Sequence, residues 1–149
     1  MNLILWRHAD AVDAAPGKPD AARELTRKGE KQAESMAAWL GPRLDEHATV
    51  IVSPAQRAQQ TARALSRKVV TCPEIGTGAD APSILRAAGW PGGDGTVVVV
   101  GHQPTLGQAA ALALTGRAVD WSIRKGAIWW LESRDEERIV RAVLTPDML

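Results

Sequence analysis

One segment constrains the fold of this chain more than any other, the β-branched run Thr-Val-Val-Val-Val at residues 96–100. A strand with one face in water alternates apolar with polar side chains, whereas this run predicts a strand that is buried on both faces. Apolar residues also dominate 2–6 and 49–52, which predict two further strands of the same kind. Such strands belong to parallel sheets that helices cover on both faces, so we expect a fold of the α/β class.

Helical patterns follow each of these strands. Thr26 is placed to cap one helix, and another follows the strand at 96–100. Ser53 is expected to cap a third helix, with Pro54 at its first position and Gln56 at its third. Apolar residues spaced three or four positions apart predict the buried faces of the three helices. They are Ala33, Met36, Ala37 and Leu40; Ala55, Ala58, Ala62 and Leu65; and Leu106, Ala109, Ala110, Ala113 and Leu114.

Smaller elements complete the expected order. Residues 69–71 predict a short strand, and residues 82–88 predict a brief helix. Residues 127–132 and 138–144 predict an antiparallel hairpin at the edge of the sheet. The whole order predicts a single three-layer α/β/α domain over residues 1–149, with a mostly parallel central sheet and an antiparallel edge strand.

The composition excludes several classes of protein. The net charge is +1 and the chain has neither Tyr nor Phe, so we expect no base-stacking surface and no nucleic-acid partner. The single cysteine, Cys72, can form neither an internal disulfide nor a CxxC metal site. No apolar stretch reaches the roughly 18 residues that span a bilayer, and residues 1–6 lack the features of a signal peptide. We therefore expect a soluble, cytoplasmic protein without a membrane partner.

Arginine and histidine residues follow all three buried strands. Arg7 and His8 come directly after the first strand, and His102 follows the third. Arg57 lies about one helical turn beyond Ser53, which follows the second strand. The carboxyl ends of parallel strands meet at one edge of the sheet, where α/β proteins bind their ligands. Each residue alone is more often a surface charge or a structural histidine, but four such groups together repel one another unless an anion binds there.

The expected ligand of this edge is a phosphoryl group. Arginine binds oxyanions through two parallel N–H groups, so two arginines and two imidazoles match the several oxygens of phosphate or sulfate better than a carboxylate. Helices that begin near Ser53 and Gln103 would add backbone N–H groups and a favourable dipole. The chain has no GxxxxGKS/T motif, which excludes a P-loop.

The residues around this predicted site resemble a known family. The run Leu-Trp-Arg-His-Ala at 5–9 is similar to the Arg-His-Gly/Ala signature of the histidine phosphatase superfamily, which has the phosphoglycerate mutase-like fold. The small SixA-like branch of phosphohistidine phosphatases is the most similar. Ala9 stands where many members have glycine, and Gln103 stands where asparagine is common. The further segments that carry the likeness are, in order, 25–33, 53–62, 100–104 and 144–146.

The resemblance implies a role for each residue of the predicted site. His8 corresponds to the nucleophile, which would accept the phosphoryl group in a covalent phosphohistidine intermediate. Arg7, Arg57 and His102 correspond to the phosphate pocket, to which Gln103 would add a contact. The resemblance implies neither a metal nor a cofactor, and an imidazole with one free ring nitrogen is itself a competent phosphoryl acceptor.

A proton donor for the leaving group is expected between the second arginine and the second histidine, where related phosphomonoesterases carry a carboxylic acid. Glu74 and Asp80 are the candidates in this segment, and Asp10 lies nearer the nucleophile in sequence. Glu74 is favoured, because Asp80 can equally cap the brief helix that follows it.

The expected substrate is a phosphorylated protein. His102 follows Arg57 by only 45 positions, which leaves little chain for a lid over a small metabolite. An open pocket suits the phosphohistidine of a signalling or phosphocarrier protein, because an imidazole leaves without help from a strong acid. Two alternatives stay open, a small-molecule phosphomonoesterase of the same superfamily and a non-catalytic module that binds phosphoproteins.

A metal-dependent alternative has less support. His8, Asp10 and His102 match the ligand types of an iron site with two histidines and one carboxylate. Such sites are typical of all-β proteins, whereas this chain alternates strands with helices, and Arg7 and Arg57 would lie beside the cation. A mutase of the same superfamily is disfavoured because the short chain leaves little to enclose a phosphosugar.

Overall fold

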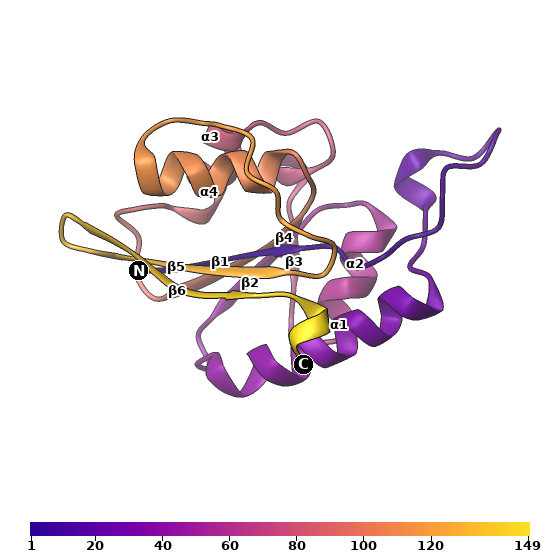
Figure 1. Ribbon diagram of the computed structural model, residues 1–149, viewed down its shortest axis with the longest axis horizontal. Helices are drawn as coiled ribbons and strands as arrows, with labels where there is room; N and C mark the ends of the chain where they lie inside the picture. The colour runs from indigo at the N-terminus through magenta and orange to yellow at the C-terminus, as the bar shows by residue number, and fades with distance from the viewer.

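A six-stranded sheet forms the centre of the molecule (Figure 1). The computed structural model describes residues 1–149, and its strands are β1 (Asn2–Arg7), β2 (Thr49–Val52), β3 (Val70–Thr71), β4 (Thr96–Gly101), β5 (Ile128–Arg134) and β6 (Glu137–Leu144). The strand order is β3-β2-β4-β1-β5-β6. Strands β1 to β4 run parallel, while β5 runs antiparallel to β1 and β6. The predicted mostly parallel sheet with a hairpin at its edge is confirmed, with β5 as the antiparallel strand and β6 outermost.

Four α-helices cover the two faces of the sheet. They are α1 (Arg27–Leu40), α2 (Gln56–Arg63), α3 (Ala81–Ala88) and α4 (Thr105–Thr115). Helices α1 and α2 lie on one face and α3 and α4 on the other, which gives the three layers (Figure 1). The side chains of β1 alternate between two cores, with Leu3 and Leu5 facing α3 and α4, and Ile4 and Trp6 facing α1 and α2. None of the helices has both the length and the apolar character needed to cross a lipid bilayer.

The parallel register brings the carboxyl ends of β1, β2 and β4 together. Arg7 at the end of β1 lies beside Gly101 at the end of β4. The backbone ladder continues one residue further, because the N–H of His8 donates to the carbonyl oxygen of Gly101 at 3.0 Å. The N–H of Ser53 likewise donates to the carbonyl oxygen of Val100 at 3.0 Å. The residues that follow these strands are therefore fixed at one edge of the sheet.

Two helix starts test the predicted caps. Thr26 caps α1 as predicted, because its Oγ1 accepts a hydrogen bond from the N–H of Gly29 at 3.0 Å. The prediction that Ser53 caps the next helix is wrong, since α2 begins at Gln56 and its N-cap is Ala55. Ser53 is fully buried, and its hydroxyl is turned toward a histidine at the edge of the sheet. The same oxygen accepts from the N–H of Ala55 at 3.2 Å, but this local bond closes a turn ahead of α2 and does not cap the helix.

Two glycines let loops pack directly against helices. A Cβ on Gly29 of α1 would overlap the carbonyl oxygen of Asp10, so the segment after β1 rests on the helix backbone. A Cβ on Gly107 of α4 would overlap the carbonyl oxygen of Trp121, so the loop before β5 rests on α4 in the same way. Both loops carry residues of the carboxyl edge, and this close packing fixes their positions.

Candidate active site

Four basic side chains converge at the carboxyl edge of the sheet. Arg7 ends β1 and His8 follows it, His102 follows β4, and Arg57 lies in the first turn of α2. The ring centroids of His8 and His102 are 5.3 Å apart. Arg57 and His102 are each 5% exposed, and His8 is 6% exposed. Basic side chains that gather at the carboxyl edge of an α/β sheet are typical of a site that binds an anion, so the arrangement points to an anionic ligand.

The contacts of His8 fix the position of its proton. Its Nδ1 lies 2.8 Å from the carbonyl oxygen of Ala9, an atom that can only accept a hydrogen bond. The neutral ring therefore carries its proton on Nδ1 and keeps a lone pair on Nε2. Burial lowers the pKa of His8 to about 3, with smaller contributions from His102 and the two arginines, against the opposing effect of the bond to Ala9. At neutral pH the ring is uncharged, and Nε2 can act as a nucleophile.

His102 is held by a serine from the neighbouring strand end. Its Nε2 lies 2.7 Å from Oγ of Ser53. That Oγ also accepts a hydrogen bond from the N–H of Ala55 at 3.2 Å. The other ring nitrogen of His102, Nδ1, is buried and has no hydrogen-bond partner. Burial, followed by the charge of Arg57, lowers the pKa of His102 to about 4.

We expect both rings to stay neutral well below pH 6.5, the ordinary pKa of histidine. In the unfolded chain each ring binds a proton as the pH falls through 6.5, whereas in the folded chain the pKa values are about 3 and about 4. The unfolded state then holds more protons, so acidification lowers the free energy of unfolding, by up to about 1.4 kcal/mol per pH unit for each ring. Nitrogen-15 NMR of the rings, with urea unfolding at about pH 7 and about pH 5, measures both effects.

The matched control for this pH dependence is the double variant His8→Asn, His102→Asn. It lacks both imidazoles, so its free energy of unfolding should depend less steeply on pH over the same range. A ring that titrates near 6.5 in the folded protein would contradict the burial seen at this edge.

Each arginine is held through terminal nitrogens of its guanidinium, while its Nε has no partner. Nη1 of Arg7 donates to the carbonyl oxygen of Ile123 at 2.9 Å. Nη1 and Nη2 of Arg57 donate to the carbonyl oxygen and to Oδ2 of Asp20, at 2.9 and 3.0 Å. The Nε atoms of both arginines are buried without a partner. Burial, and then the nearby charge of Arg57, lower the pKa of Arg7.

Three buried nitrogens of this site therefore lack a hydrogen-bond partner in the protein. They are Nε of Arg7, Nε of Arg57 and Nδ1 of His102. Each buried polar group left in this state costs about 1–3 kcal/mol, and folded proteins rarely leave three of them together. They come from three separate segments of the chain. A tetrahedral oxyanion supplies several acceptor oxygens with negative charge, which matches this set of nitrogens.

Known proteins resemble this chain over most of its length. The sequence model of the histidine phosphatase superfamily (branch 1) matches residues 3–76. The chain is 32% identical over 141 residues to an uncharacterized protein of Picosynechococcus sp., which covers 89% of this chain and 86% of that protein. It is 32% identical over 124 residues to phosphohistidine phosphatase SixA of Escherichia coli, covering 74% of this chain and 73% of SixA. This chain belongs to the histidine phosphatase superfamily.

The fold of this histidine phosphatase agrees with a solved structure from the same family. The protein histidine phosphatase SixA complexed with tungstate superimposes with a TM-score of 0.84 and 25% sequence identity, over 99% of each chain. The predicted SixA-like, phosphoglycerate mutase-like α/β fold is thereby confirmed. Tungstate, which that relative binds, is a tetrahedral oxyanion like phosphate.

Two further residues of this histidine phosphatase, Asp20 and Thr61, contact the site and were not predicted from the sequence. Asp20 lies in a short 3-10 helix between β1 and α1, and hydrogen bonds from Arg57 and Arg23 lower the pKa of its carboxyl. Its pairing with Arg57 spans 37 residues of chain, which no local pattern predicts. Thr61 accepts from the N–H of Ala9 at 3.0 Å and donates to the carbonyl oxygen of Arg57 at 2.7 Å. Its place one turn after Arg57 was the only available signal.

Gln103 lies beside the site but its side chain does not face the phosphate pocket. Its Nε2 donates to the carbonyl oxygen of Trp121 at 2.9 Å, and its Oε1 accepts from the N–H of Gly107 at 2.7 Å. Both ends of the carboxamide are therefore occupied. This side chain ties the loop that carries Ile123 to α4, and Ile123 in turn holds Arg7. The predicted contact of Gln103 with phosphate stays a prediction, with its backbone N–H as the group that can make it.

The two acidic candidates lie on the surface. Asp80 is the N-cap of α3, where Oδ1 accepts from the N–H of Ser83 at 2.9 Å. Hydrogen bonding from Ser83 lowers the pKa of the Asp80 carboxyl. Glu74 is exposed in the short 3-10 helix after β3 and lines the same surface hollow as Asp80. Neither carboxyl is hydrogen-bonded to His8 or His102.

Asp10 is held away from the two histidines. Its Oδ2 accepts from the hydroxyl of Thr26 at 2.7 Å, and its Oδ1 pairs with Nζ of Lys125 at 2.9 Å. These two bonds lower the pKa of the carboxyl. His8, Asp10 and His102 therefore do not gather as the iron ligands considered from the sequence, and no other three His, Cys, Asp or Glu side chains gather in a form that could hold a metal ion.

Proposed function

We propose that this histidine phosphatase hydrolyses phosphohistidine on a partner protein through a covalent intermediate at its own His8. The observation that carries the proposal is the free Nε2 lone pair of a neutral, buried imidazole whose tautomer is fixed by Ala9. A module that only binds phosphoproteins needs the arginines but has no use for such a nucleophile. The SixA name of one relative and the tungstate bound by another support an oxyanion pocket of the same kind here.

In the first step, Nε2 of His8 attacks phosphorus in line with the substrate's P–N bond. The new P–Nε2 bond forms as the old bond breaks. The second ring nitrogen of the substrate takes a proton from water, so the substrate ring leaves as neutral imidazole. The free N–H groups of Arg7 and Arg57 bind the equatorial oxygens, where negative charge spreads in the transition state. Ser53 accepts from Ala55 and can donate its own hydrogen to Nε2 of His102. In that arrangement the proton of the ring lies on Nδ1, where it can be donated to a phosphoryl oxygen.

In the second step, water attacks the phosphorylated His8. The P–Nε2 bond breaks, inorganic phosphate leaves, and the ring returns to its neutral form with the proton on Nδ1. The carbonyl oxygen of Ala9 keeps the ring in one orientation through both steps, because its hydrogen bond lies on the side away from phosphorus.

The positions of the acidic residues favour phosphohistidine over a phosphate ester. An alkoxide leaving group needs a carboxylic acid within hydrogen-bond reach, whereas an imidazole, with an ordinary pKa of about 6.5, leaves with little help. Asp80 is engaged as a helix cap, and Glu74 is exposed in the same surface hollow. A substrate presented on a protein surface would also exclude water from the open edge of the sheet.

The proposal is tested by turnover in EDTA, measured in parallel on a phosphohistidine-bearing carrier protein and on an aryl phosphate. We expect activity to survive the chelator, and kcat/KM for the protein to exceed that for the ester by about tenfold or more. Preference for the ester would favour the small-molecule phosphatase instead. Phosphate binding without turnover of either substrate would favour the binding module, and activity lost only in EDTA would require a metal-dependent mechanism.

A further inference from the structure

A basic surface adjoins the catalytic pocket and is not used by the chemistry described above. Two hollows, of about 430 and 590 Å³, share Lys28, Gln32 and Pro146. The first also includes Arg7 of the catalytic pocket, so the surface is continuous with the site. We call this surface the basic groove. Its cations are Arg7, Arg27, Lys28, Lys31, Arg124 and Lys125.

The positive charge of the basic groove is not neutralised within the protein. Only two carboxylates line it, those of Asp10 and Asp147. Asp10 is engaged by Thr26 and Lys125, and Asp147 accepts from the hydroxyl of Thr145. Its other exposed cations, at positions 27, 28, 31 and 124, form no ion pair. The whole chain has a net charge of +1, so this excess of cations is local.

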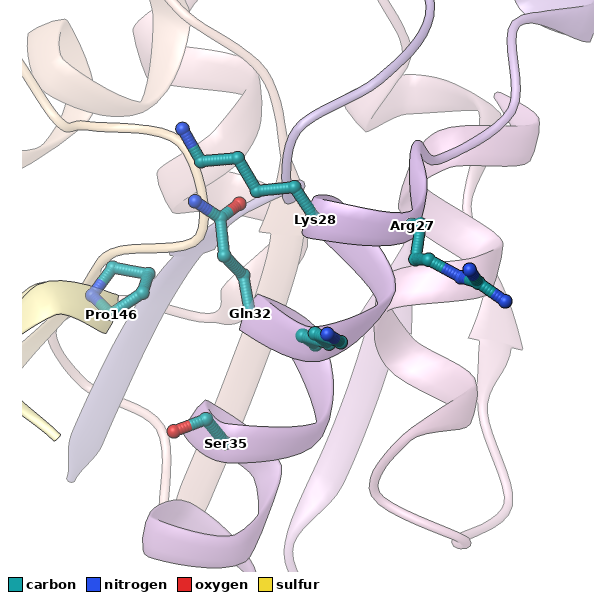
Figure 2. A pocket seen from close by; sticks show the side chains of 6 residues that line it. Arg27, Lys28, Gln32, Ser35 and Pro146 are labelled. Carbon is teal, nitrogen blue, oxygen red and sulfur yellow. The ribbon is translucent and has the colours of Figure 1, made fainter.

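Helix α1 contributes cations but no carboxylate to the basic groove. Figure 2 shows Lys28, Gln32 and Ser35 on the flank that faces Pro146, with Arg27 extending from the first turn. The carboxylates of the helix, Glu30 and Glu34, line a different hollow. A surface that serves only solubility mixes the two signs, because like charges side by side repel one another. The part of α1 that lines the groove therefore suits an anionic partner.

The lining of the basic groove indicates what kind of partner fits it. No hydrophobic side chain lines either hollow, so the groove lacks the apolar anchors that hold a peripheral protein on a membrane. It has no aromatic side chain on which a nucleic-acid base could stack. Its chemistry is that of long, exposed cations, which bind carboxylate groups and accelerate the encounter with an acidic protein.

We propose that the basic groove binds an acidic surface of the phosphoprotein substrate, beside the phosphohistidine that enters the catalytic pocket. This inference rests on the proposed function. Arg7 links the two regions, because it lines the groove and also carries one of the buried nitrogens that lack a partner at the site. A protein that presents its phosphohistidine to His8 must lay the neighbouring surface over the rim of the pocket, and the groove is part of that rim.

The test is the charge-reversal variant Arg27→Glu, Lys31→Glu. Both side chains are exposed and form neither an ion pair nor a side-chain hydrogen bond, and both lie in the hollow that does not include Arg7. Expected is a fall of about tenfold in kcat/KM for an acidic phosphohistidine-bearing carrier protein at low salt, mostly through KM, because rim charges act on association. The difference from wild type should shrink in high salt. Kinetics on an aryl phosphate should stay unchanged.

The matched control is Lys68→Glu, Arg117→Glu, which changes the net charge equally. Lys68 precedes β3, which runs parallel to β2, and Arg117 follows α4, which begins at the carboxyl edge and runs back from it. Both residues therefore lie toward the end of the sheet away from the catalytic pocket. An equal loss in both variants would overturn the groove as the docking surface, since net charge alone would explain it. Wild-type kcat/KM in the Arg27, Lys31 variant would overturn the groove but leave the proposed function intact. No turnover of the carrier by the wild-type enzyme would overturn both.

Discussion

Replacement of His8 by alanine is expected to lower kcat by about 10⁴-fold or more while phosphate binding stays measurable. The substitution removes Nε2, whose lone pair is free because the bond to Ala9 keeps the ring proton on Nδ1. It leaves the two arginines and His102, whose buried nitrogens have no partner in the protein. Steady-state kinetics on the phosphohistidine carrier and calorimetric titration with inorganic phosphate measure the two effects.

A second variant separates loss of the nucleophile from loss of structure. His8→Asn keeps an N–H near the position of Nδ1, which can still donate to the carbonyl oxygen of Ala9, but has no counterpart of Nε2. It should be as inactive as the alanine variant and closer to wild type in thermal stability. His47→Ala, at an exposed loop histidine, should keep full activity. Full turnover by either His8 variant would show that another residue accepts the phosphoryl group.

The covalent intermediate offers an independent readout of the same assignment. Brief incubation with labelled phosphohistidine carrier should transfer label to the wild-type enzyme in an acid-labile, alkali-stable linkage, as expected for a phosphorus–nitrogen bond. The His8 variants should carry none. Label on His102 would reverse the roles of the two imidazoles, although burial of Nδ1 and the bond of Nε2 to Ser53 make that ring the less accessible nucleophile.

The parts of this fold that could be predicted from sequence depend on local signals. Buried strands are continuous apolar runs, so β1, β2 and β4 were located to within a residue or so at each end. In a parallel sheet all such strands end at one edge, which brings Arg7, His8, Arg57 and His102 together without knowledge of any side-chain contact. The cap of α1 could also be predicted from a local signal, because Thr26 accepts a hydrogen bond from Gly29, only three positions away.

The parts that sequence analysis missed depend on partners distant in the chain. The hydroxyl of Ser53 forms a local bond with the N–H of Ala55, as its sequence context suggests, but it also bonds His102, which lies 49 positions away in sequence. Gln103 is adjacent to a site residue, yet the carbonyl oxygen of Trp121 and the N–H of Gly107 occupy its side chain. Asp20 lies in a 3-10 helix of only three residues, which is too short to show a periodic pattern in the sequence. These contacts decide how the site is held, and they follow from tertiary structure alone.

Arg57 contacts Asp20 and also has a nitrogen free for the ligand, so even its replacement by lysine should lower activity. Arg57→Lys is expected to lower kcat/KM for the carrier by about 10²-fold or more. The guanidinium of Arg57 binds Asp20 through Nη1 and Nη2 and still has Nε free. A lysine ammonium is a single point of contact, so it can stay with the ionised carboxylate of Asp20 or move to the phosphoryl oxygens, but it cannot hold both in the geometry of a planar fork.

The controls for this variant come from the same contact and the same helix. Arg63→Lys, at an exposed position of α2, should leave kcat/KM unchanged. Asp20→Asn should have a smaller effect than Arg57→Lys, because the backbone carbonyl of residue 20 still holds Nη1 and the freed guanidinium remains able to bind phosphate. If Arg57→Lys keeps its rate within about threefold of wild type, bidentate binding by Arg57 is not what stabilises the transition state. Phosphate recognition would then rest on Arg7 and His102, whose nitrogens are equally buried and equally without a partner in the protein.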